Sequence, residues 1–473
     1  MTQNIAKAAP LSGAPKIHMP SIFGIVAGKP LLYHIPVTGQ RPMEICVEGL
    51  CDGVKFENGM LLGEAKTHQV FRIQVRAKNE LGQTEKTVEV TVGENTQLLT
   101  PLLGFTTWNA FANKVRQEDV EQTAEQMAKR GLREVGYGYV NLDSGWQKEY
   151  GGELDAILPN EKFPDMKAMT DKIHSLGLRA GIYSTPMRTA WGCPEGYEWV
   201  PGCTTGEPDL FMPDTMGGIG LVHKEENNVR QWEQWGFDYL KYDWSLPDPV
   251  NAEKMRKPLM ASKRAFAYCI TVLAHHAFKS YWKQYCNSWR DNEDSIDEWA
   301  NLKRRLLTVD KWLGVVCRGH FYDLDMLEIG AMDWNEDKSR LTEDEALFAF
   351  TMRAFFLSPI QISCKLDKLS DFEFDMICND EILTLHQDAL CDYPQLAYRS
   401  EDETVKLYKR VLENGDCAIA VFNTRDEDFE HTYETEDECL VRDVWSKEDI
   451  VTAKAFAFTV PAHGVRVFRL TKK

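Results

Sequence analysis

The sequence lacks the features of membrane-spanning, secreted and disordered proteins. No uninterrupted apolar run is long enough to cross a bilayer, and the first seven residues lack the apolar stretch of a signal peptide. We therefore expect a cytoplasmic protein that keeps its twelve cysteines mostly reduced. With only 20 prolines in 473 residues and no low-complexity tract, the chain is expected to be folded throughout.

Positive charge is also in deficit. The formal net charge of −18 would repel both nucleic acid and anionic membranes, so neither is expected as a partner. Cys46 and Cys51 lack a second pair at zinc-binding spacing, and no metal or other cofactor is expected. Cys193 and Cys203 bracket a loop rich in proline and glycine, and their pairing is left open. The composition fits an enzyme that acts on a neutral small molecule; assembly into a homo-oligomer is also left open.

The two ends of the chain have the period-two alternation of β-strands. This pattern predicts a β-sandwich over residues 17–97, preceded by a frayed segment 1–16. It returns over residues 391–473 and predicts a second, antiparallel β-domain. There the turn at Asn414-Gly415 indicates a hairpin between strands near residues 405–409 and 418–422.

Residues 98–390 follow a different rhythm, in which short apolar runs alternate with helical stretches. Helices are expected at residues 117–130 and 165–175, each closed by a glycine. Up to eight such units predict an α/β fold of the (β/α)₈ TIM-barrel type. The expected strands cover residues 103–108, 137–143, 178–183, 237–243, 266–269, 284–290, 315–318 and 359–364.

Polar and aromatic residues gather where these strands end. Lys241 and Asp243 finish the fourth strand, and in TIM barrels the carboxyl ends of the strands carry the chemistry. Taken alone, this pair fits a structural ion pair equally well. Similar residues follow other strands: Trp108, Asn109, Asn141, Asp143, Ser144, Trp146, Trp289, Arg290, Asp291, Asp294, His320, Asp323 and Asp325. Indole rings stack on sugars and charged groups bind hydroxyls, while two carboxyl groups suffice for glycoside hydrolysis. The rim therefore indicates an oligosaccharide or glycoside substrate.

Six motifs in this region resemble those of glycoside hydrolase family 27, the melibiase-type α-galactosidases and α-N-acetylgalactosaminidases. The resemblance runs from about Leu103 to the C-terminus, and the leading sandwich is similar to immunoglobulin-like modules of some bacterial members. The motifs are GFTTWN (104–109), NLDSGW (141–146), GIYS (181–184), YLKYD (239–243), NSWR (287–290) and DLDML (323–327).

The resemblance implies a role for each matching residue. Asp243 would be the nucleophile of a retaining mechanism, and Asp294 the acid/base about 5 Å away, with a pKa raised by partial burial. Asp291 and Glu293 compete for the acid/base role. Lys241 would bind sugar hydroxyls and keep Asp243 ionised. The remaining candidate substrate-binding residues are Trp108, Asp143, Ser144, Thr271, Trp289 and Arg290.

Two departures from the family concern the identity of the sugar. Ser144 stands where members often carry a second aspartate, and the segment around Thr271 lacks the usual glutamate. We therefore expect an exo-acting α-galactosidase on oligosaccharides, and keep open another glycone, such as an α-glucoside, a β-L-arabinopyranoside or an α-N-acetylgalactosaminide. Transfer to a sugar in place of water is a further alternative. A carbohydrate-binding pseudoenzyme is the alternative from another class, disfavoured by the presence of both Asp243 and Asp294.

Overall fold

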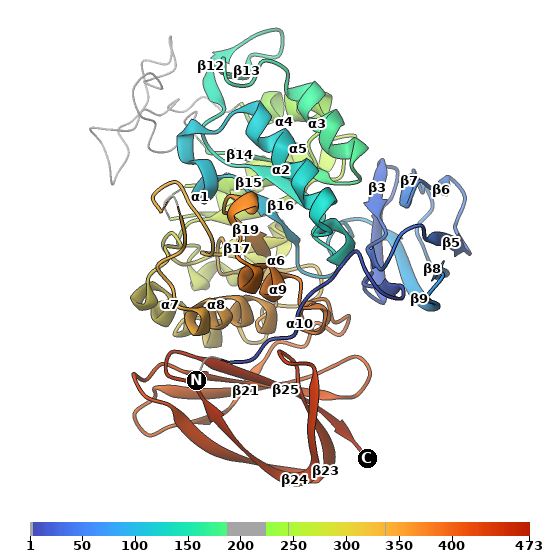
Figure 1. The fold of residues 1–473 in the computed structure, drawn as a ribbon. Helices are drawn as coiled ribbons and strands as arrows, with labels where there is room; N and C mark the ends of the chain where they lie inside the picture. Colours follow the sequence, from blue (N-terminus) through green and yellow to red (C-terminus); the bar gives the residue numbers. More distant parts are fainter. Residues whose placement is uncertain (1–2, 187–223, 245, 336) are drawn as a thin grey trace.

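The computed structural model describes residues 3–186, 224–244, 246–335 and 337–473. A central barrel is flanked by an N-terminal β-module on one side and a C-terminal β-domain below (Figure 1). Cys193 and Cys203 lie outside the described residues. Among those described, no helix has both the length and the apolar character needed to cross a membrane.

The barrel is built from eight parallel strands in the order β18-β17-β16-β15-β14-β11-β10-β19, which confirms the predicted TIM-barrel fold. Its strands are short and almost entirely buried, as expected of a sheet covered by helices. They are β10 (Leu103–Thr106), β11 (Tyr139–Leu142), β14 (Arg179–Ser184), β15 (Tyr239–Asp243), β16 (Ala267–Thr271), β17 (Ser288–Arg290), β18 (Phe321–Asp323) and β19 (Ile360–Ile362).

The barrel closes just beyond the end of β18. Leu327 forms a parallel bridge with Ile362, and its N–H donates to the Gln361 carbonyl at 2.9 Å. The Leu324 N–H donates to Ser358 Oγ at 2.8 Å. The segment from Leu324 to Leu327 therefore completes the wall, so Asp325 is held beside the rim.

Helices cover the outside of the barrel (Figure 1). The helix predicted at 117–130 has those bounds in the structure, and Gly131 at φ +83° ends it. The helices are α1 (Trp108–Phe111), α2 (Gln117–Arg130), α3 (Met166–Ser175), α4 (Glu225–Trp235), α5 (Pro249–Ala261), α6 (Lys279–Tyr285), α7 (Trp299–Leu306), α8 (Glu343–Phe355), α9 (Asp371–Ile377) and α10 (Asp380–His386). A hairpin of β12 (Gln147–Gly151) and β13 (Ala156–Pro159) is inserted after β11.

The strand predicted at 315–318 is wrong. Val315 and Val316 are buried, but they follow the short 3₁₀ turn Val309–Trp312 and pack into the core without joining the sheet. The seventh strand is β18, a few residues later. A short apolar run does not by itself distinguish a strand from a buried turn.

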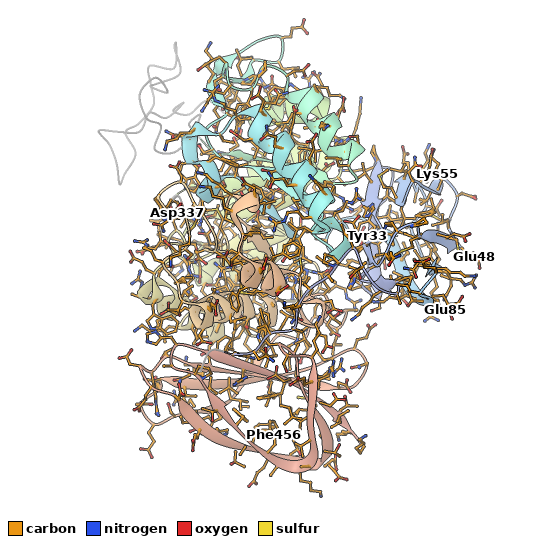
Figure 2. The ribbon with its side chains drawn as sticks, in the orientation of Figure 1. Tyr33, Glu48, Lys55, Glu85, Asp337 and Phe456 are labelled. Atoms are coloured by element: carbon orange, nitrogen blue, oxygen red, sulfur yellow. The ribbon has the colours of Figure 1, made fainter. Side chains whose placement is uncertain are left out.

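The N-terminal module consists of three small sheets around its own apolar core. Its strands are β1 (Lys16–Ile17), β2 (Ile22–Val26), β3 (Leu31–His34), β4 (Val37–Thr38), β5 (Glu44–Glu48), β6 (Val54–Glu57), β7 (Met60–Gly63), β8 (Gln69–Asn79) and β9 (Gly82–Gly93). Tyr33 lies on the side that faces the barrel, whereas Glu48, Lys55 and Glu85 lie on the outer side (Figure 2).

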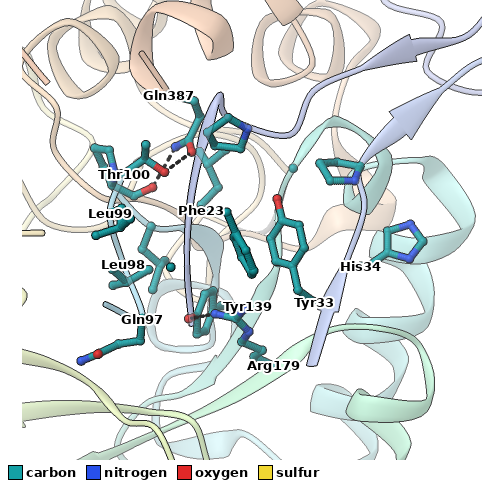
Figure 3. A pocket seen from close by; sticks show the side chains of 18 of the residues that line it. Phe23, Tyr33, His34, Gln97, Leu98, Leu99, Thr100, Tyr139, Arg179 and Gln387 are labelled. Carbon is teal, nitrogen blue, oxygen red and sulfur yellow. Dashed lines mark hydrogen bonds between the residues drawn. The ribbon is translucent and has the colours of Figure 1, made fainter. Parts of the chain in front are cut away.

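The module contacts the N-terminal end of the barrel around Arg179, at the start of β14. Its guanidinium donates from Nε to the Leu32 carbonyl at 2.8 Å and from Nη1 to the Tyr139 hydroxyl at 2.6 Å. It also lies over the rings of Tyr33 and Tyr139, at 5.7 and 5.2 Å. Tyr33, Tyr139 and Arg179 line an interdomain cavity (Figure 3), which is at the opposite end of the strands from the predicted chemistry.

Residues 3–16 are not frayed, contrary to the prediction. They run as an extended strap from the C-terminal domain along the barrel to the N-terminal module (Figure 1). The Gln3 N–H donates to Asp344 at 3.2 Å, the Ala6 N–H to the Trp445 carbonyl at 2.9 Å, and the Ala8 N–H to Asp375 at 2.8 Å. Tertiary hydrogen bonds therefore order a segment whose composition predicts a loose end.

The C-terminal domain is one curled antiparallel sheet, with Phe456 in its hollow (Figure 2). The predicted hairpin is confirmed: β21 pairs with β22 around the turn at Asn414-Gly415, where Gly415 has φ +86°. The strands are β20 (Gln395–Arg399), β21 (Val405–Val411), β22 (Cys417–Asn423), β23 (Phe429–Asp443), β24 (Glu448–Val460) and β25 (Val465–Lys472). The predicted limits between the three regions stay a prediction.

Candidate active site

Strand alternation places the candidate groups on the inner face at one end of the barrel. Lys241 and Asp243 are two residues apart on β15 and share a face. In register across β16 they pair with Cys269 and Thr271. Charged and polar side chains therefore meet in two successive layers at the carboxyl ends of these strands.

Lys241 is paired with Asp143 from the end of β11. Its Nζ donates to Asp143 Oδ2 at 2.8 Å, and Thr106 Oγ1 lies 3.4 Å from the same oxygen. Burial lowers the pKa of Lys241, but Asp143 and Asp243 outweigh it and raise the pKa above its ordinary value. The side chain therefore stays an ammonium and offers donors toward the pocket.

Asp243 lies near enough to Lys241 and Arg290 for both cations to act on its charge. The Tyr183 hydroxyl donates to Asp243 Oδ2 at 3.0 Å. Removal from water raises the pKa of Asp243 to about 6, against the lowering effect of Lys241 and Arg290. Lys241 therefore acts in the predicted direction, but it does not hold the pKa of Asp243 at its ordinary value, because desolvation of the carboxylate is the larger effect.

Arg290 joins two carboxylates at the end of β17. Its Nη1 lies 2.5 Å from Asp325 Oδ2, and its Nη2 donates to Asp294 Oδ1 at 2.7 Å. Burial would lower the pKa of Arg290, but Asp325 and Asp294 hold it well above its ordinary value. Burial likewise opposes ionisation of Asp325, yet Arg290 and Lys241 hold the pKa of that carboxyl below its usual range. Asp325 also has a left-handed backbone, with φ +68°.

Asp294 is more exposed than predicted. Its side chain is 74% exposed, so the partial burial expected of the acid is absent, because the loop after β17 carries the carboxylate outward from the wall. Of its two competitors, Asp291 is bound to Trp312 Nε1 at 2.9 Å and to Lys311, on the outer side of the barrel. Glu293 is exposed, and its carbonyl accepts from Arg305. Of the three, Asp294 is the carboxylate that contacts Arg290.

The prediction that Trp289 binds substrate is wrong. Its neighbours on β17, Ser288 and Arg290, face inward, so Trp289 faces the helices. The ring is 0% exposed and packs on Trp312 at 5.2 Å. It supports the wall of the barrel and offers no face to a sugar.

The other predicted binding residues lie at the same end of the barrel. Trp108 is partly exposed and begins α1, directly after β10. Ser144 is buried, and its N–H donates to Asp143 Oδ1 at 2.8 Å. Thr271 lines a small inner pocket together with Lys241, Arg290 and others.

Sequence reasoning missed two contacts in this cluster. Tyr183 belonged to a noted motif but received no role; its pairing with Lys241 across β14 and β15 is the signal that would have placed it beside Asp243. Cys269 was interpreted as a small hydrophobe, yet its Sγ lies 3.5 Å from Asp323 Oδ2. Burial raises the pKa of the Cys269 thiol, so it acts as a neutral donor to the carboxylate.

His320 does not join the aspartates of the seventh strand. Its Nδ1 contacts the Cys286 carbonyl at 2.8 Å. Within the described part of the chain, no three histidine, cysteine or acidic side chains are grouped as metal ligands would be.

Comparison with known proteins agrees with this geometry. A family model described as alpha galactosidase A matches residues 100–202 and 209–388, and a model of the alpha galactosidase C-terminal beta sandwich domain matches residues 402–470. Alpha-galactosidase 2 of Arabidopsis thaliana is 28% identical over 300 residues, covering 62% of this chain and 68% of the relative. Alpha-galactosidase A of Cellvibrio japonicus is 25% identical over 410 residues, covering 79% and 92%.

Solved structures share the fold. A candidate alpha-galactosidase/melibiase of Bacteroides fragilis has a TM-score of 0.86 at 24% identity and covers 98% of this chain and 99% of its own. A β-L-arabinopyranosidase of Geobacillus stearothermophilus has a TM-score of 0.68 at 22% identity, covering 79% and 96%. At such identities the structural likeness supports the fold alone. Since the two family models together match more than half of the chain, the protein belongs to the melibiase-type alpha-galactosidase family of glycoside hydrolases.

Proposed function

We propose that this enzyme is a retaining exo-α-galactosidase that removes terminal α-linked galactose from oligosaccharides. The observation that carries the proposal is the placement of Asp243 at the end of β15. Its carboxylate accepts from Tyr183, lies near two cations and has a pKa of about 6. At neutral pH such a carboxylate is ionised yet poorly solvated, as a nucleophile for an anomeric carbon should be. Attack would form a covalent glycosyl-enzyme that water then hydrolyses.

Asp294 is the proposed acid/base. It shares Arg290 with the inner carboxylates, and its exposed position leaves room for a leaving group. In the first step it would give a proton to the glycosidic oxygen, and in the second it would take one from water. Lys241 and Asp143 form a donor and acceptor pair suited to sugar hydroxyls.

The identity of the sugar is argued from the pocket residues and from the relatives. Ser144 and Thr271 are small, buried residues where larger carboxylates are common in the resembled family. The relatives by sequence are named alpha-galactosidases, which favours galactose. A solved structure with the same fold is a β-L-arabinopyranosidase, so that glycone is the second candidate.

A panel of p-nitrophenyl glycosides tests the activity. Wild type should release p-nitrophenol fastest from the α-galactoside, and Asp243→Ala should release none. Proton NMR of the first-formed sugar should show the α-anomer, as retention requires. A β-anomer would contradict both retention and the nucleophile, whereas a preference for the β-L-arabinopyranoside would change only the glycone.

Three further features belong to the same proposal. The N-terminal β-module is of the immunoglobulin-like type, which its small sheets and separate core support. The protein is cytoplasmic, which the ten unpaired cysteines among the described residues support. Its oligomeric state stays open; size-exclusion chromatography with light scattering would measure it.

A further inference from the structure

Few contacts of its own side chain hold Asp294 in place. Its side chain is 74% exposed, and Arg290 is the side chain that its carboxylate contacts. A general acid must stay within a fraction of an ångström of its working position. The backbone of the loop that carries Asp294 must therefore supply the precision.

Arg305 on α7 holds the backbone of this loop by hydrogen bonds. Arg305 Nη2 donates to the Glu293 carbonyl at 2.8 Å, and its Nε donates to Asn301 Oδ1 at 2.9 Å. Asn301 Nδ2 in turn donates to the Asp294 carbonyl at 3.2 Å. One guanidinium thus fixes two successive carbonyls, the first directly and the second through an oriented amide.

The same guanidinium holds the segment that aligns Arg290. Arg305 Nη1 donates to the Leu324 carbonyl at 3.0 Å, directly before Asp325. Asp325 Oδ2 accepts from Arg290 and also from the Ser295 N–H at 2.7 Å. Arg305 therefore holds the backbone on both sides of the Asp294–Arg290 contact.

Arg305 is 2% exposed, and it contacts carbonyl and amide groups of the loops, not the candidate catalytic carboxylates. Its nearest carboxylate is Glu328 Oε1, 4.0 Å from Nε, while Glu328 Oε2 accepts from Arg353 at 2.8 Å. An apolar side chain could fill this space, but it could not fix the direction of three carbonyl groups as a planar, multiply donating group does.

We propose that Arg305 is a positioning residue for the acid/base Asp294, acting through the Glu293 carbonyl, Asn301 and the Leu324 carbonyl. The inference rests on the proposed function, because it assumes that Asp294 is the acid. Its consequence is specific: loss of Arg305 contacts should impair proton donation to the leaving group more than any other step.

Leaving-group dependence measures that step. A 4-methoxyphenyl α-galactoside needs protonation of its leaving group, whereas a 2,4-dinitrophenyl α-galactoside does not. For Arg305→Lys, kcat/KM on the first substrate should fall by about 30-fold, which is part of the roughly 10²–10⁴-fold that general acid catalysis contributes, and on the second by less than about 3-fold. Arg304→Lys, on an exposed neighbour in the same helix, is the matched control and should change neither.

An equal loss on both substrates, or no loss on either, would overturn the role of Arg305. Circular dichroism must show that the variant is folded; if it is not, Asn301→Ala decides. It removes the contact to the Asp294 carbonyl and the Arg305 Nε bond, leaves Arg305 bound to the Glu293 and Leu324 carbonyls, and should give the same asymmetry. Asp294→Ala separates the two claims. If Asp294→Ala does not lose more activity on the 4-methoxyphenyl substrate than on the 2,4-dinitrophenyl one, Asp294 is not the acid. If Asp294→Ala shows this difference while Arg305→Lys and Asn301→Ala do not, only the positioning role of Arg305 fails.

Discussion

The two ends of β15 carry aspartates whose pKa values are shifted in opposite directions. Asp238, just before the strand, accepts from His174 at 2.7 Å, from the Ala180 N–H at 3.0 Å and from Arg264. Burial raises its pKa, but His174 and Arg264 outweigh it and hold the pKa at about 2. Asp243 lies at the other end. Burial raises its pKa to about 6, because the lowering effect of Lys241 and Arg290 is smaller than the effect of burial.

The difference between them lies in whether burial or the neighbouring charges have the larger effect on the pKa. Asp238 has a direct ionic partner in Arg264 and a hydrogen-bond partner in His174, next to the interdomain contact, so its charge stabilises the fold. The cations near Asp243 are engaged mainly by other carboxylates: Lys241 by Asp143, and Arg290 by Asp325 and Asp294. A barrel can thus use one end of a strand for stability and keep the other reactive.

The largest expected effect is the loss of turnover in Asp243→Asn. Without a nucleophile, kcat/KM should fall by at least about 10⁴-fold, whereas Asp238→Asn should stay within a few-fold of wild type at a temperature where it is folded. Initial rates on p-nitrophenyl α-galactoside measure both. Comparable losses in the two variants would remove the distinction between a reactive and a structural end.

Next is the stability of Asp238→Asn. Removing one partner of a buried ionic cluster should lower the free energy of unfolding by about 3 kcal/mol at pH 7. The folded pKa is depressed, so this contribution is lost as pH falls from about 4 through 2, and the variant should approach wild type there. Urea unfolding at several pH values measures it; a difference that does not depend on pH would point to packing instead of charge.

Asp243→Asn should change the free energy of unfolding in the opposite direction. The folded pKa is raised from 3.8 to about 6, so ionised Asp243 destabilises the folded state above that pH. The variant should gain about 1–3 kcal/mol at pH 7 and little at pH 4, where the folded carboxyl is protonated and the unfolded one is near its own pKa. Thermal unfolding at pH 7 and pH 4 tests this. A variant that is less stable than wild type at pH 7 would contradict the desolvated carboxylate.

The smallest effect concerns Tyr183→Phe. The hydroxyl stabilises ionised Asp243, so its loss should raise the pKa further and move the acid limb of kcat/KM upward from about pH 6. One hydrogen bond of about 1 kcal/mol predicts a roughly 5-fold loss at pH 5. Tyr137→Phe, which loses a buried bond to the Ile377 carbonyl, is the control and should leave the pH profile unchanged.

Much of the fold followed from sequence because local signals were strong. The bounds of α2 were predicted because Gly131 supplies a left-handed cap. Helix α8 was missed because Glu345 to Phe355 are all buried, so its apolar residues show no one-sided period. Residues 3–8 were misjudged because distant domains, not local composition, hold them in place.

In the candidate site, too, features set by local pattern were predicted from sequence, and features set by the folded protein were not. The inward placement of Lys241 and Asp243 follows from alternation along a strand, and the same alternation excludes Trp289 beside Arg290. The exposure of Asp294 depends on the course of a loop, which no period encodes. The pKa of Asp243 depends on desolvation by surrounding strands against the pull of two cations, and that balance exists only in the folded protein.

The strap formed by the first residues has a consequence for how the chain is made. Its partners include Trp445, Asp344 and Asp375, so residues 3–8 bind surfaces that are synthesised more than 300 residues after them. Barrel strands and the N-terminal module can assemble during synthesis, but residues 3–8 must wait for the C-terminal domain. Closure of the strap is therefore expected to be among the last events of folding, and a bulky fusion at the N-terminus would act on the far end of the molecule.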